Sequence, residues 1–150
     1  SESASSVSKT SRIRRPIAAL AARILAIDDE PMVGTALKRV LGKENEVVTE
    51  TSARKALDRI RAGEHFDLIL CDLMMPEMTG LDFYNELREL SPARASEIVF
   101  MTGGAFTPKA RAFLESVTNE RLEKPFDMAT LKSLVQDHLL MHPGAVGKKR

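Results

Sequence analysis

Three acidic residues stand directly after short apolar stretches, where carboxylates could do chemistry. Asp28 and Asp29 follow RILAI, and Asp72 follows LILC. Carboxylates that lie close together repel one another, and their pKa values rise unless a cation intervenes. Oxygen ligands that leave several positions to water suit Mg²⁺. The three aspartates therefore predict a magnesium site, and an aspartate beside magnesium is a known type of nucleophile toward phosphorus.

A hydroxyl group and an ammonium group follow two later apolar stretches. Thr102 comes after IVFM, and Lys124 comes after RLE. A lysine supplies a point charge that suits a phosphoryl oxygen, and a threonine hydroxyl can donate a hydrogen bond to the same group. Phosphoryl transfer needs mainly in-line positioning and charge neutralisation. A fold that gathered these residues could therefore transfer a phosphoryl group to an aspartate.

Apolar stretches typical of strands alternate along the chain with stretches of helical spacing. The predicted strands cover residues 23–28, 46–50, 66–71, 98–101 and, more weakly, 121–123. Apolar residues three and four positions apart predict a helix after each strand. Five strand–helix units in about 120 residues imply an α/β fold, an all-parallel sheet with helices on both faces. Right-handed crossovers favour the flavodoxin-like (βα)5 doubly wound sheet with strand order 2-1-3-4-5.

All the candidate residues stand at the carboxyl ends of predicted strands. Ligands of such sheets bind at those ends, where the strand order reverses. Strands one and three are neighbours in the predicted order, so Asp28 and Asp29 share a crevice with Asp72. Thr102 and Lys124 end the fourth and fifth strands at the same edge. The pattern therefore predicts one site.

Four segments carry a resemblance to a known family. LAIDDEP, LILCDLMMPEMTG, VFMTGG and LEKPF resemble the signature blocks of response-regulator receiver domains of two-component signalling. The resemblance covers roughly residues 23–140. It implies a signalling domain that takes a phosphoryl group from the phosphohistidine of a histidine kinase or a histidine phosphotransfer domain. The phosphorylated domain would then offer its partners a changed surface.

The resemblance also implies a role for each candidate residue. Asp72 is similar to the phosphoacceptor, and Asp29 to the direct Mg²⁺ ligand, with Asp28 acting mainly through metal-bound water. The backbone carbonyl of Met74 matches the third protein ligand of the metal. Lys124 matches the lysine that pairs with the phosphoryl group, and Thr102 the switch hydroxyl that moves toward it.

The loop residues follow the family pattern, while the switch position departs from it. Pro76 and Gly80 match the loop after the phosphoacceptor, and the Lys124–Pro125 bond is commonly cis in this family. The family often has an aromatic residue three positions before the lysine, and here that residue is Arg121. We therefore expect signalling through shifts of loops and helices in place of the usual aromatic movement.

Two further departures concern hydrolysis of the phosphorylated aspartate. Met74 and Gly104 occupy positions where polar side chains in relatives help to place the attacking water. Neither residue can hold a water through a side-chain hydrogen bond. We therefore predict slow to moderate self-dephosphorylation.

Length and composition favour one soluble domain with loose ends. The chain has 150 residues, of which 43% are hydrophobic and 29% are charged. We expect residues 1–22 to be a flexible linker or a segment added to the natural chain. The receiver domain would cover residues 23–140, and residues 141–150 would form a flexible basic tail. The segment IAALAAR at 17–23 could form a short helix.

Charge and cysteine content exclude several classes of function. Residues 1–22 carry a net charge of +3, residues 143–150 carry +3, and the segment between them carries −5. An acidic core between basic tails does not predict nucleic-acid binding. No apolar run approaches the roughly 18 residues of a membrane span, and the single cysteine, Cys71, fits the core of a protein in a reducing compartment. We expect a cytoplasmic protein with no membrane contact.

Alternatives remain open at this point. A phosphatase of the haloacid-dehalogenase type also uses an aspartate and magnesium, although Asp28 followed by Glu30 matches its motif poorly. A receiver fold could also serve as an interaction domain that needs no phosphorylation. Within the receiver hypothesis, the chain fits the C-terminal receiver of a hybrid histidine kinase slightly better than a stand-alone receiver. The three histidines have no metal-binding spacing and predict surface or structural roles.

Overall fold

A computed structural model of the chain describes residues 21–104 and 107–142. The predicted linker and tail lie almost wholly outside the described residues. The helix expected at 17–23 lies mostly outside them too, and residues 21 and 22 are not helical. Within the described part, no helix is long and apolar enough to cross a membrane.

The sheet has the predicted topology. Its strands pair in parallel in the order β2-β1-β3-β4-β5, so the reversal of strand order falls between β1 and β3. The strands are β1 (Arg23–Ile27), β2 (Glu46–Glu50), β3 (Leu68–Asp72), β4 (Val99–Gly103) and β5 (Arg121–Lys124). The flavodoxin-like fold and its order are therefore confirmed, with strand ends within two residues of the predictions.

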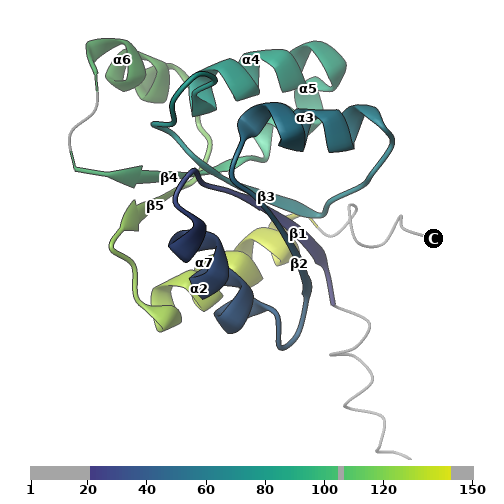
Figure 1. Ribbon diagram of the computed structural model, residues 1–150. Helices are drawn as coiled ribbons and strands as arrows, with labels where there is room; N and C mark the ends of the chain where they lie inside the picture. The colour runs from purple at the N-terminus through teal and green to yellow at the C-terminus, as the bar shows by residue number, and fades with distance from the viewer. Residues whose placement is uncertain (1–20, 105–106, 143–150) are drawn as a thin grey trace, which may run out of the picture.

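Helices cover both faces of this sheet. Figure 1 shows α3, α4, α5 and α6 on one side and α2 and α7 on the other. The two sides correspond to two clusters of buried apolar residues, one under each set of helices. The helices are α2 (Pro31–Leu41), α3 (Ala53–Arg61), α4 (Gly80–Leu90), α5 (Pro92–Ser96), α6 (Pro108–Ser116) and α7 (Met128–Met141).

The helix starts follow from local sequence. Ser52, Thr79, Thr107 and Asp127 each accept a hydrogen bond from a backbone N–H in the first turn of the helix that follows, which satisfies a donor that the helix cannot pair internally. The short helix α5 was not predicted. Ser91 caps it and Pro92 is its first residue, which together are a signal for the start of a helix. The helix is too short to show any apolar periodicity.

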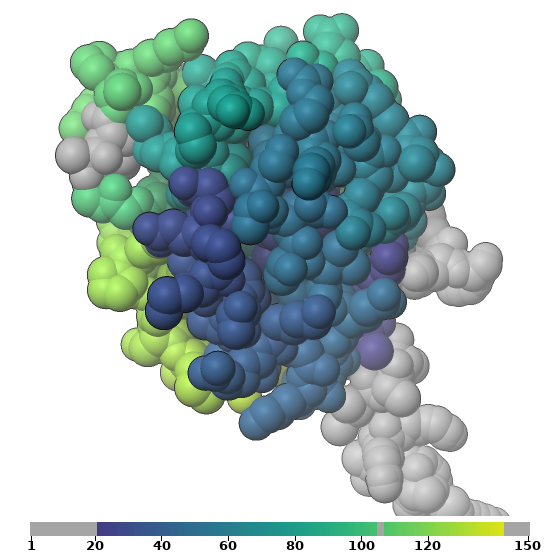
Figure 2. Space-filling model, viewed as in Figure 1, coloured from purple at the N-terminus to yellow at the C-terminus, as the bar shows by residue number. Residues whose placement is uncertain are grey.

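The strands form the centre of the core. Ile24, Leu25, Ile27 and Phe100 are completely buried, because helices cover both faces of a parallel sheet. In the space-filling view of Figure 2, side chains of the helices hide most of the sheet. Cys71 is free and fully buried in this core, as predicted. The packed strands give a rigid base to the loops at their carboxyl ends.

Candidate functional site

The fold brings the predicted site residues to one edge of the sheet. Asp28 follows β1 directly, Asp72 is the last residue of β3, and Lys124 is the last residue of β5. Thr102 is the second-last residue of β4, and the register pairs Asp72 with the residue before it. Asp29 lies in the turn that leads into α2. The sequence therefore located this edge correctly.

Three carboxylates form an acidic cluster at this edge. Carboxylate oxygens of Asp28, Asp29 and Asp72 all lie within 4.8 Å of one another. Asp28 is 2% exposed and Asp72 is 7% exposed, so water screens their charges poorly. A cluster of hard oxygen donors in a partly dry site has the chemistry that Mg²⁺ requires.

Lys124 lies against two members of the cluster. Its Nζ donates a hydrogen bond to Asp28 Oδ2 at 2.7 Å and lies 3.5 Å from Asp72 Oδ1. The other oxygen of Asp28, Oδ1, accepts a hydrogen bond of 2.9 Å from the backbone N–H of Glu30. Both oxygens of Asp28 are thereby held, and the ammonium group stays beside the Asp72 carboxylate.

Negative charge exceeds positive charge at this site, because three carboxylates face one ammonium group among the described residues. Burial, and next the charge of Asp28, raise the pKa of Asp72 from 3.8 to about 6, although Lys124 opposes the rise. Burial by itself would lower the pKa of Lys124. The hydrogen bond to Asp28 and the charges of Asp72 and Glu30 outweigh burial and raise the pKa of Lys124 overall. One lysine therefore does not neutralise the cluster fully, and a further cation fits it.

The loop after Asp72 folds back over the end of β3. A Cβ atom on Gly80 would lie 2.7 Å from the backbone oxygen of Asp72 and 2.9 Å from Leu73 Cα, closer than any side chain tolerates. The backbone N–H of Gly80 donates to Leu73 O at 2.9 Å. Thr79 and Asp82 form a reciprocal cap at the start of α4. Only glycine at position 80 permits this approach, as the resemblance implied.

Thr102 lies at the same edge of the sheet as Asp72. Thr102 is 7% exposed. The strand register places the next residue, Gly103, beside Lys124. Within the described residues the Thr102 side chain has no hydrogen bond. The hydroxyl is therefore available to a ligand at the edge of the sheet.

The remaining predicted positions lie at the margin of the site. Met74 is 37% exposed in the loop after Asp72. Gly104 is exposed with a φ of 50°, and a Cβ there would meet no atom of the described residues within 4 Å. The Lys124–Pro125 bond is cis, as the resemblance implied. The metal-ligand role of the Met74 carbonyl stays a prediction.

Arg121 has a function that sequence reasoning missed. Its guanidinium donates hydrogen bonds to the backbone oxygens of Leu114, Val117 (3.1 Å) and Asn119 (3.2 Å). These oxygens belong to the last turn of α6 and the segment that follows it. Arginine donors suit the orphan carbonyls at a helix end. The residue in place of the aromatic therefore ties β5 to the end of α6, and no local sequence signal indicates such a contact.

A comparison with protein families decides the identity of this fold and site. The model of the response regulator receiver domain matches residues 24–136, which contain all the residues of the acidic cluster together with Thr102 and Lys124. The chain belongs to the response regulator receiver domain family. This membership confirms the resemblance and favours a receiver domain over a haloacid-dehalogenase phosphatase.

Curated relatives of this receiver domain differ in length. An uncharacterized 14.6 kDa protein of Leptolyngbya boryana is 33% identical over 80% of the chain and 92% of its own length. The transcriptional regulatory protein ZraR of Escherichia coli is 32% identical over 77% of the chain. The chain spans only 26% of ZraR, so this relative has further regions that the chain does not match.

Solved structures of receiver domains share the fold. A response regulator receiver domain from Clostridium thermocellum has a TM-score of 0.71 and 26% identity, covering 81% of this chain and 97% of that one. The receiver domain of a signal transduction histidine kinase from Syntrophus aciditrophicus has a TM-score of 0.68 and 26% identity, covering 87% of this chain and 94% of that one. The receiver fold is thus present in both kinds of protein.

Proposed function

We propose that this domain accepts a phosphoryl group on Asp72 from the phosphohistidine of a histidine kinase or a histidine phosphotransfer domain. One observation carries the proposal. The Lys124 ammonium group lies 2.7 Å from Asp28 and 3.5 Å from Asp72 in a cluster of three converging carboxylates. A nucleophile, a cation-binding pair and a fixed positive charge are therefore adjacent, which is what phosphoryl transfer requires.

The chemical step is a displacement at phosphorus. An Asp72 carboxylate oxygen forms a bond to phosphorus while the bond from phosphorus to the histidine nitrogen breaks. The electron pair of the broken bond stays on the imidazole, which takes up a proton from solvent. Lys124 places its charge beside the oxygens of the phosphoryl group, where negative charge is greatest. Asp72 has to be deprotonated to attack, so its raised pKa ties phosphorylation to pH.

Asp28, Asp29, Asp72 and the Met74 carbonyl would hold Mg²⁺. When bound, Mg²⁺ supplies neutralisation of the charge on the phosphoryl oxygens. The fit follows from the excess negative charge of the cluster and from the oxygen donors themselves. Lys124, whose Nζ lies 3.5 Å from Asp72 Oδ1, would face the phosphoryl group from the other side of the cluster.

The domain acts in this proposal as a phosphoacceptor and not as a turnover enzyme. Thr102, whose side chain has no hydrogen bond within the described residues, would donate one to the phosphoryl group. The response would then pass along β4 to α6, changing the surface offered to partners. The histidine kinase receiver from Syntrophus aciditrophicus supports a place in a hybrid kinase, and the Leptolyngbya relative supports a stand-alone receiver.

The test is incubation of the full chain with a small-molecule phosphodonor, with and without Mg²⁺, followed by intact mass measurement. We expect the addition of one phosphoryl group, dependent on Mg²⁺, labile in base and absent from Asp72→Asn. Asp137→Asn is the matched control, because Asp137 is exposed on α7, outside the acidic cluster. Equal labelling of Asp72→Asn and the wild-type chain would overturn the proposal.

A further inference from the structure

The edge strand β2 offers backbone groups that no other described strand uses. β2 lies at one end of the sheet and pairs only with β1 among the described strands. The backbone N–H of Glu46 donates to Ala22 O at 2.9 Å, and Glu50 O accepts from Asp28 N at 3.1 Å. Residues of a parallel strand pair alternately toward its two neighbours. Val47 and Thr49 therefore direct their N–H and C=O groups away from the sheet.

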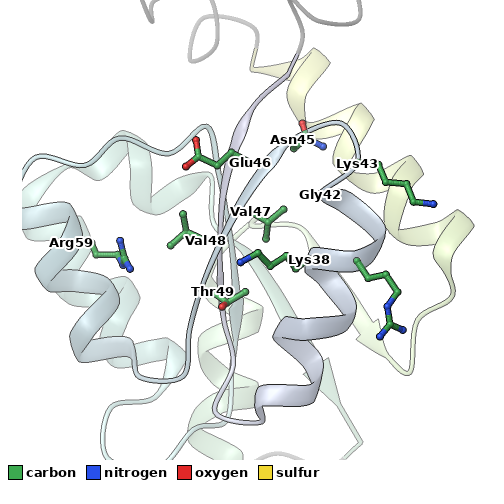
Figure 3. Close-up of a pocket in the computed structure, with 10 residues that line it drawn as sticks. Lys38, Gly42, Lys43, Asn45, Glu46, Val47, Val48, Thr49 and Arg59 are labelled. Carbon is green, nitrogen blue, oxygen red and sulfur yellow. The ribbon is translucent and has the colours of Figure 1, made fainter.

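The open edge borders a groove lined with basic side chains. The groove has a volume of about 680 Å³ and lies along β2, between α2 and α3. Figure 3 shows the Lys38 side chain pointing from α2 toward β2 near Thr49, with Arg59 on the opposite side of the strand. Lys43, in the turn after α2, also lines it. An unpaired strand edge and a set of cations therefore share one surface.

Among the residues that the structure describes, the basic side chains of the groove lack acidic partners on only one side of β2. Arg59, on the α3 side, forms ion pairs with Glu50 and Glu64. Lys38, Arg39 and Lys43, on the α2 side, are exposed, and within the described residues they have no ion pair or hydrogen bond from their side chains. The helix dipole suits Lys38 and Arg39 in the last turn of α2. Lys43 lies beyond that turn, so the dipole does not account for the whole set.

This charge selects among possible occupants of the edge. A second copy of the chain would bring the same cations against these, and like charges facing each other are destabilising. The flanking segments 1–22 and 143–150 each carry a net charge of +3 and would be repelled as well. A segment with acidic side chains has complementary charge. Its own backbone can also pair with Val47 and Thr49, as in strand addition to a sheet edge.

We propose that the β2 edge is a docking site for an extended acidic segment of a partner protein, which would add a strand to the sheet. Side chains of an added strand alternate between its faces. Those opposite Val47 and Thr49 would face α2, where Lys38, Arg39 and Lys43 favour glutamate or aspartate. Those opposite Val48, which is half-buried against the α3 side of the core, would be apolar.

The probe is a short peptide that alternates glutamate and valine, added to the full chain and followed by NMR and amide hydrogen exchange. We expect saturable binding, shifts confined to β2 and the end of α2, and slower exchange of the Val47 and Thr49 amides. Lys38→Glu combined with Lys43→Glu should weaken binding roughly ten-fold. Lys132→Glu, on exposed α7 surface, should not. An unchanged thermal midpoint shows that each variant is folded.

Four outcomes would overturn the docking proposal. They are no saturable binding to the wild-type chain, equal binding of a peptide with lysine in place of glutamate, equal binding by the doubly substituted chain, and binding without slower exchange at Val47 and Thr49. Self-association of the chain through β2, measured by sedimentation, would assign the edge to a second copy instead. None of these outcomes depends on whether Asp72 is labelled by a phosphodonor. The docking proposal and the proposed function can therefore fail separately.

Discussion

The charged form of the Asp72 carboxylate is less favourable in the folded chain than in the unfolded chain. Burial and the neighbouring Asp28 raise its pKa to about 6, from 3.8 in the absence of these neighbours. A carboxyl group with a raised folded-state pKa stabilises the fold most below the unfolded pKa. That contribution is lost as the pH rises through the folded-state pKa. The proposed phosphoacceptor is therefore expected to weaken the fold at neutral pH unless a cation is bound.

Replacing this carboxylate should stabilise the domain at neutral pH in the absence of divalent cations. Asp72→Asn should raise the free energy of unfolding at pH 7 by about 1–2 kcal/mol, because the buried negative charge is removed. The gain should shrink as the pH falls from about 7 to about 4. Mg²⁺ should stabilise the wild-type chain more at pH 7 than at pH 5, because protons compete for the same carboxylates.

Urea unfolding across this pH range, with and without Mg²⁺, measures the effect. Asp137→Asn is the control and should change the free energy of unfolding little at any of these pH values, since Asp137 is exposed. A variant Asp72→Asn that is less stable than the wild-type chain at pH 7 without Mg²⁺ would show that the charge of Asp72 stabilises the fold.

Two residues at the margin of the site should set the lifetime of the phosphorylated state. Met74 is partly exposed in the loop after Asp72, and Gly104 is exposed. Neither side chain can hold an attacking water, so we expect the purified phosphorylated protein to lose its phosphoryl group over minutes or longer. Met74→Asn should shorten that half-life several-fold. Intact mass measured over time gives both values, and a wild-type half-life of seconds would contradict the expectation.

At the scale of the elements, Arg121 connects a strand to a helix that packs on the sheet. Its three hydrogen bonds reach the last turn of α6 and the segment that follows it, and α6 is the helix after β4 in the chain. In the family the equivalent position often holds an aromatic residue that moves. A guanidinium held by backbone carbonyls is fixed by geometry, so α6 and β5 should shift together in this chain.

Loss of the Arg121 side chain should loosen α6 locally. Arg121→Ala should lower the free energy of unfolding by about 1 kcal/mol, because three carbonyl oxygens lose a charged donor at a partly exposed site. It should also speed amide exchange in α6 without preventing phosphorylation of Asp72. Lys109→Ala, on the exposed surface of the same helix, is the control. Unchanged exchange in α6 of Arg121→Ala would remove the proposed connection.

The elements were predictable where their signal is local, and the contacts between them were not. Helix α2 was predictable from local sequence, because its apolar spacing and Pro31 mark its face and its start. Asp28, Asp72 and Lys124 were found because parallel strands end at one edge. The pairing of Lys124 with Asp28 at 2.7 Å joins residues 96 positions apart, and the Arg121 contacts depend on how α6 packs. Contacts between residues so far apart in the sequence depend on how the whole fold packs, so no local sequence pattern predicts them.

At the scale of the whole molecule, contacts extend slightly beyond the predicted domain of residues 23–140. The backbone of Ala22 bonds to Asn45 Oδ1 at 3.0 Å and to Glu46 N at 2.9 Å. At the other end, the His142 ring lies 4.4 Å from that of His138, which is 2% exposed. These contacts fit the surface or structural roles predicted for the histidines, and both ends of the described part contact the rest of the fold.

A chain cut to residues 21–142 should therefore keep the properties of the whole. We expect an unchanged thermal midpoint and unchanged labelling of Asp72, because every contact described above is retained.

A shorter chain of residues 23–139 would lose the bonds of Ala22 and the ring contact of His142. His138 would then keep only Glu120 as a side-chain partner, at 2.8 Å. Losing several such contacts should lower the free energy of unfolding by about 1–3 kcal/mol. Thermal unfolding of the three chains compares them, and a 21–142 chain that melts well below the full chain would mean that the flanking segments help to hold the receiver fold.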